Sequence, residues 1–134
     1  MSVVVDFLAK SGVQFFATVG ADGGPKVRPF QFMLEEGGRL YYCTSNRKSV
    51  FKEMRKDPRV EISACGEDSS WIRLSGKAVF VDDLGLKARI QDASPLVKSI
   101  YKTPDNPDFE VFYLAEAEAT ISDFSGDPPR RFKL

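Results

Sequence analysis

Residues 14–33, QFFATVGADGGPKVRPFQFM, contain the pattern that decides the fold. The segments QFFATVG (14–20) and KVRPFQFM (26–33) carry the Val, Thr and Phe residues typical of strands, and the glycine-rich turn ADGGP (21–25) separates them. Two strands joined by so short a turn pair antiparallel. Because Pro29 cannot donate a hydrogen bond to a central ladder, the second strand is expected to have an edge-like or interrupted hydrogen-bond pattern.

Further segments on the C-terminal side of this hairpin also have the alternating pattern of strands. They are RLYYCT (39–44), RVEISACG (59–66), WIRLSGKAVFV (71–81) and FEVFYLAEAEATISDF (109–124). Helical patterns occupy residues 2–11 before the stop signal Gly12, residues 45–58, and residues 83–101 with a break at Ser94-Pro95. DPPRRFKL (127–134) is expected to be a polar tail. The sequence therefore predicts a mainly β (α+β) fold, an antiparallel six-stranded barrel with peripheral helices, in one domain over residues 1–134.

The composition limits the possible functions. Nineteen basic residues balance nineteen acidic ones among 134 residues, so the chain lacks the overall positive charge of a nucleic-acid binder, and any anion site must be local. The first ten residues form no leader and no stretch is long enough for a membrane span, so we expect a cytoplasmic protein with neither a nucleic-acid nor a membrane partner. The chain has no histidine, which removes the commonest metal ligand and the usual general base.

Other groups with metal-binding or redox chemistry have simpler interpretations. Cys43 and Cys65 lie far apart without a CxxC spacing, and we expect reduced thiols within strands. The carboxylates of Asp82 and Asp83 lack a third ligand at a suitable spacing, so a helix start is the better interpretation and no metal site is predicted.

A candidate anion site lies where the strand RLYYCT meets the helix of residues 45–58. Ser45 or Asn46 is the expected N-cap, which places Arg47 and Lys48 in the first turn. Basic residues are unfavourable at that end of a helix dipole unless an anion such as phosphate binds there, although two solvated surface charges explain them equally well. Arg28 reaches the same phosphate if the hairpin packs beside this helix; otherwise it is an outward-facing strand residue.

Taken in order, VRPFQFM (27–33), LYYCTSNRK (40–48), KDPRVEIS (56–63) and WIRLSGKA (71–78) resemble the pyridoxamine 5'-phosphate oxidase-like FMN-binding split barrels. The resemblance covers most of the chain and is strongest across residues 26–81. It implies a homodimer with the flavin at the interface, so that part of each site comes from the partner chain.

The resemblance also implies roles for individual residues. FMN would lie along Arg28, Pro29, Phe30 and Gln31, its ring would be lined by Tyr42, Cys43 and Thr44, and its phosphate would be held by Arg47 and Lys48. Trp71 stands where the family often has a polar side chain beside the ring, so packing replaces a hydrogen bond there.

The C-terminus does not resemble the segment that pyridoxamine 5'-phosphate oxidases use to hold their substrate, which argues against vitamin B6 oxidation. The resemblance then implies an FMN-binding flavoprotein, an oxidoreductase for an unidentified small substrate with a small-molecule reductant or acceptor. The alternatives are a non-enzymatic FMN carrier or electron-transfer protein, a related barrel that binds F420 or haem, and an interaction module without cofactor. The missing histidine makes haem the weakest of these.

Overall fold

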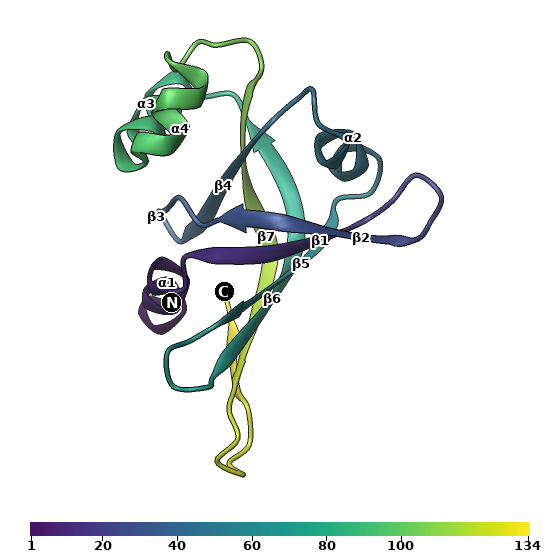
Figure 1. Cartoon of the computed structure of the whole chain (residues 1–134), viewed down its shortest axis with the longest axis vertical. Coiled ribbons are helices and arrows are strands. Elements are labelled where there is room, and N and C mark those ends of the chain that lie inside the picture. The colour runs from purple at the N-terminus through teal and green to yellow at the C-terminus, as the bar shows by residue number, and fades with distance from the viewer.

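The computed structural model describes all residues, 1–134, and contains four helices and eight strands (Figure 1). The helices are α1 (Ser2–Lys10), α2 (Ser49–Lys56), α3 (Leu84–Ala93) and α4 (Pro95–Tyr101). The strands are β1 (Val13–Val19), β2 (Pro25–Gln31), β3 (Leu34–Glu36), β4 (Arg39–Ser45), β5 (Arg59–Cys65), β6 (Trp71–Val81), β7 (Phe109–Ser122) and β8 (Arg130–Lys133). Every strand pair is antiparallel, which confirms the predicted fold class.

The strands form one curved sheet in the order β2-β1-β5-β6-β7-β4-β3, and β8 pairs with the second half of β7. β6 and β7 run together through the length of the molecule in Figure 1. Along one edge, β7 pairs with β6. Along the other edge, residues 109–113 of β7 pair with β4 and residues 118–121 pair with β8. Between these halves, Glu116 has a positive φ of 52° and the register of β6 shifts between Ser75 and Lys77. Such a bulge bends both strands and lets the sheet curl into a barrel.

The barrel is split between β2 and β4. β2 pairs only with β1, so its other edge is free, as Pro29 predicts. β3 covers β4 only as far as Tyr41, so residues 42–45 of β4 are paired on the β7 side alone. The free edge of β2 and the free half of β4 therefore leave backbone groups available at the split.

Two apolar clusters hold the structure together. Phe16, Tyr42 and Phe112 form an aromatic cluster inside the barrel, and α1 packs against it through Val4 and Leu8. α3 and α4 lie side by side at one end of the molecule in Figure 1 and cover a second cluster. That cluster contains Tyr41, Leu86, Ile90, Val97, Tyr101, Phe109 and Val111. No helix combines the length and apolar character that a membrane crossing requires.

The predicted helix boundaries between residues 82 and 101 are confirmed. The Asp83 carboxylate accepts a hydrogen bond of 3.0 Å from the Leu86 backbone N–H and caps α3, so it is a helix start as expected. The helical stretch breaks at Ser94-Pro95, where Ser94 caps α4.

Two short strands were not predicted. β3 comprises the three residues before the turn at Gly37-Gly38, and β8 lies within the segment interpreted as a polar tail. The tail prediction is wrong for Arg130–Lys133, which pair with Glu118–Ile121 of β7. Three of these four residues are charged, so their own pattern does not indicate a strand. They become one by pairing with the preceding strand, β7, across the loop of residues 123–129.

Candidate functional site

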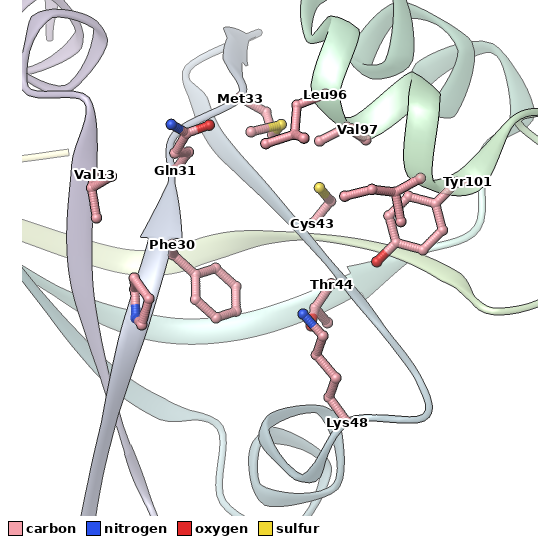
Figure 2. A pocket seen from close by; sticks show the side chains of 12 residues that line it. Val13, Phe30, Gln31, Met33, Cys43, Thr44, Lys48, Leu96, Val97 and Tyr101 are labelled. Carbon is pink, nitrogen blue, oxygen red and sulfur yellow. The ribbon is translucent and has the colours of Figure 1, made fainter.

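A hollow of about 280 Å³ lies at the split of the barrel, between β2, β4 and α4 (Figure 2). Twelve residues line it: Val13, Pro29, Phe30, Gln31, Met33, Cys43, Thr44, Lys48, Leu96, Val97, Ile100 and Tyr101. Most of them are apolar, one is a cation and none is a carboxylate. We refer to this hollow as the split pocket. It is open to solvent and small for a ligand site.

The β2 wall of the split pocket is formed by Pro29, Phe30 and Gln31, three of the residues named in the sequence analysis. The Phe30 ring packs on the core side against Phe16, with centroids 4.4 Å apart, and its exposed edge faces the pocket. Pro29 and Gln31 point to the other face of the strand but reach the pocket because it lies along the strand edge.

The β4 wall is formed by Cys43 and Thr44. Burial raises the pKa of Cys43 to about 12, and the Lys48 ammonium lowers it by a smaller amount, so the thiol is protonated and not a nucleophile at neutral pH. Thr44 is 3% exposed, and its hydroxyl has no hydrogen-bond partner in the chain. A buried hydroxyl without a partner costs about 1–3 kcal/mol, so a ligand at this position would satisfy it.

Lys48 supplies the charge of the split pocket. α2 begins at Ser49 and Lys48 is its N-cap residue, so the predicted cap at Ser45 or Asn46 is wrong and both basic residues precede the helix. The Lys48 side chain extends into the pocket toward Thr44 (Figure 2). Arg47 does not line the pocket; its side chain is 79% exposed and its Nε lies 3.0 Å from the Asp108 carboxylate.

Arg28 does not reach the split pocket either. The hairpin packs beside α2 as supposed, but the Arg28 guanidinium donates to Glu53 Oε1 at 2.6 Å, to the Thr18 hydroxyl at 2.8 Å and to the Phe16 carbonyl at 3.2 Å. Arg28 therefore lies on β2 as predicted, but its guanidinium is paired with the Glu53 carboxylate of α2.

Tyr42 and Trp71 do not line the split pocket. Tyr42 is fully buried inside the barrel, where its hydroxyl donates a hydrogen bond of 2.8 Å to the Gln14 amide oxygen. Trp71 begins β6 and packs against Phe124 with ring centroids 5.0 Å apart.

The α4 wall of the split pocket was missed by the sequence analysis. Leu96, Val97, Ile100 and Tyr101 all line the pocket from this helix. Leu96 and Ile100 are 60% and 57% exposed. The only signal in the sequence is that SPLVKSIY is more apolar than a seven-residue surface helix requires. The same pattern is expected for a helix that packs on the core, so it does not indicate a pocket wall.

The sequence model of the pyridoxamine 5'-phosphate oxidase family matches residues 2–122. The chain belongs to this family. Among solved structures, a NimC/NimA family protein from Clostridium acetobutylicum is 36% identical, with a TM-score of 0.91 over 100% of this chain and 93% of that one.

Two more distant members of the family's fold show its range. A pyridoxamine 5'-phosphate oxidase-related, FMN-binding protein from Nostoc punctiforme is 18% identical, with a TM-score of 0.67 over 97% of this chain and 86% of that one. An F420 reductase is 19% identical, with a TM-score of 0.63 over 82% of this chain and 90% of that one. No curated protein matches the chain. At these identities the two structures support the split-barrel fold alone.

Proposed function

We propose that this protein is an FMN-binding flavoprotein that holds the flavin in the split pocket and acts as an oxidoreductase on a small substrate. One observation carries the proposal: the only charged side chain of the pocket, Lys48, lies beside the unpartnered buried hydroxyl of Thr44, and apolar walls make up the rest. A phosphate suits the polar end and a planar ring suits the apolar part. The FMN-binding protein from Nostoc punctiforme provides a precedent for this cofactor within the same fold.

Each wall would have its own task. Pro29, Phe30 and Gln31 would lie along the flavin on one side, with Cys43 and Thr44 on the other. Lys48 would hold the phosphate. Arg47 could add a second cation only after its side chain leaves Asp108.

A bound flavin supplies the chemistry, since its ring accepts a hydride or single electrons. The chain's own residues bind and orient the cofactor and keep water from the apolar part of the pocket. None of them is placed as an acid or base: the chain has no histidine, and the Cys43 thiol remains protonated. We also propose a cytoplasmic location, which suits two unpaired cysteines.

The proposed assembly is a homodimer with the flavin at the interface. Apolar residues cover the outer face of the β1–β2 hairpin, where Phe15 is 56% exposed and Val27 is 66% exposed. This face adjoins the split pocket at Val13 and Pro29. A second protomer on this face would bury apolar surface and close the open side of the pocket. Trp71 could then contribute to a pocket only as Trp71 of the partner subunit.

The test is the visible absorption spectrum of the purified protein after loading with FMN and removal of unbound cofactor. The proposal predicts retained flavin bands and their bleaching by a reduced nicotinamide cofactor or another small reductant. A flavin that stays bound but shows no saturable turnover would indicate a carrier or electron-transfer protein. A protein that retains F420 and not FMN, or retains neither, would contradict the proposal.

A further inference from the structure

We propose that Tyr101, on α4, is a ligand-binding residue of the split pocket, and that its hydroxyl and that of Thr44 together hydrogen-bond the phosphate that Lys48 attracts. This inference rests on the proposed function and extends it, because it assigns the selection of a phosphorylated cofactor to a helix outside the barrel.

The packing of Tyr101 fixes its ring but does not use its hydroxyl. The residue is 8% exposed, and its ring packs against Phe109 with centroids 4.6 Å apart. Its backbone carbonyl accepts a hydrogen bond from the Asn106 amide. No group of the chain bonds the hydroxyl, which points into the split pocket toward the side occupied by Thr44 and Lys48 (Figure 2). A phenylalanine would pack equally well here, and the hydroxyl is free to bond a group from outside the chain.

Three polar groups from three elements converge at this end of the pocket. Thr44 comes from β4, Lys48 precedes α2 and Tyr101 ends α4. Electrostatic effects link these residues through Cys43. The Lys48 ammonium lowers the pKa of the Cys43 thiol. The pKa of Tyr101 is raised mainly by burial and secondly by the charge of Cys43. Cys43 therefore lies within interaction range of both residues.

The chemistry of this set favours an anion. Burial raises the pKa of Tyr101 to about 12, so its hydroxyl keeps its proton and can donate. The Thr44 hydroxyl and the Lys48 ammonium donate as well, and no carboxylate of the pocket competes for them. Three donors around one position suit an oxygen-rich group with negative charge, and phosphate is the group that FMN would bring.

The experiment compares FMN with riboflavin, which has the same ring and lacks the phosphate. Dissociation constants for both are measured by quenching of flavin fluorescence with the wild type, Tyr101→Phe and Thr44→Val. Both substitutions remove a hydroxyl and preserve the side-chain shape, and thermal melting of each variant verifies that it folds. Tyr113→Phe is the matched control, because Tyr113 packs against Tyr41 and lies outside the pocket.

We expect each pocket variant to weaken FMN about tenfold or more, since hydrogen bonds to charged groups are the strong ones, while riboflavin affinity changes less than about twofold. Tyr113→Phe should alter neither affinity. If FMN binds the variants as tightly as the wild type, or if both flavins are weakened equally, the inference is wrong and the proposed function stands. If the wild type binds no FMN, the proposed function itself fails.

Discussion

The Arg28 guanidinium donates a hydrogen bond of 2.6 Å to the Glu53 carboxylate, and the same carboxylate oxygen accepts one of 2.7 Å from Thr18. Arg28 and Thr18 belong to the β1–β2 hairpin, whereas Glu53 belongs to α2. The network thus fixes the helix against the hairpin. Because Lys48 immediately precedes α2 and lines the split pocket, the network also helps to hold this residue in place relative to β2.

Replacement of Glu53 by alanine should destabilise the fold by about 1–3 kcal/mol, because it leaves the charge of Arg28 without its partner in a side chain that is only 22% exposed. Urea denaturation of the variant measures this loss. Glu61→Ala is the control, since Glu61 pairs with Arg73 on the surface, where both side chains are far more exposed. If Glu61→Ala lowers the free energy of unfolding as much as Glu53→Ala does, the network does not have the stabilising role described here.

Single substitutions should separate the contributions of Lys48 and Arg47 to FMN affinity. Lys48 lines the split pocket, whereas Arg47 is paired with Asp108 outside it. We expect Lys48→Ala to weaken FMN binding about tenfold or more and Arg47→Ala to weaken it less than about threefold. Equilibrium dialysis with FMN measures both. A larger loss for Arg47→Ala would show that this side chain leaves Asp108 when the cofactor binds.

Tyr42→Phe should reduce stability without affecting the cofactor. The substitution leaves the Gln14 amide oxygen buried without its donor, which costs about 1–3 kcal/mol of unfolding free energy. Because the hydroxyl lies inside the barrel, FMN affinity should remain within about twofold of the wild type. Thermal melting and an FMN titration of the same sample provide both values, and a selective loss of affinity would place Tyr42 at the flavin after all.

Phe15→Asp should convert the proposed dimer to monomers. A charge on the apolar outer face of the β1–β2 hairpin cannot be buried against a second protomer without a large desolvation cost. Sedimentation velocity measures the oligomeric state. The control is Leu84→Asp, which places the same charge at an exposed apolar position on α3. A monomeric wild type, or a Phe15→Asp variant that still dimerises, would rule out this face as the interface.

The stability that Asp57 contributes should depend on pH. Hydrogen bonds from Arg59 hold the pKa of the Asp57 carboxyl at about 2, below its ordinary 3.8. A carboxyl with a lowered pKa in the folded state stabilises the protein above its unfolded pKa and loses this effect as the pH falls through the folded value. Asp57→Asn should therefore lower the urea midpoint at neutral pH, and the difference from the wild type should vanish between about pH 4 and about pH 2. A difference that persists at the acid end would contradict this assignment.

Local patterns were sufficient to predict most of the fold. Alternating apolar residues identified the six long strands, and Pro29 identified β2 as an edge strand. Ser94-Pro95 marked the break between α3 and α4 because a proline stops a helix locally. The strand at Arg130–Lys133 could not be found in this way, since three of its four residues are charged and two prolines directly precede it.

The site was predictable only along its strands. Phe30 and Thr44 lie where their strand positions place them, at the edges of the split. The direction of a long charged side chain depends on its neighbours in space, and the sequence does not indicate that Glu53 engages Arg28 or that Asp108 engages Arg47. The ligand-facing hydroxyl of Tyr101 was equally hidden, because a tyrosine on an apolar helix face has the pattern of a core residue.

The most direct test of the central claim is a crystal structure of the protein loaded with FMN. The account predicts flavin density in the split pocket between β2 and β4, with the phosphate beside Lys48 and within hydrogen-bond distance of Thr44 and Tyr101. Flavin bound elsewhere on the protein, or bound in this pocket with its phosphate at the opposite end, would contradict it.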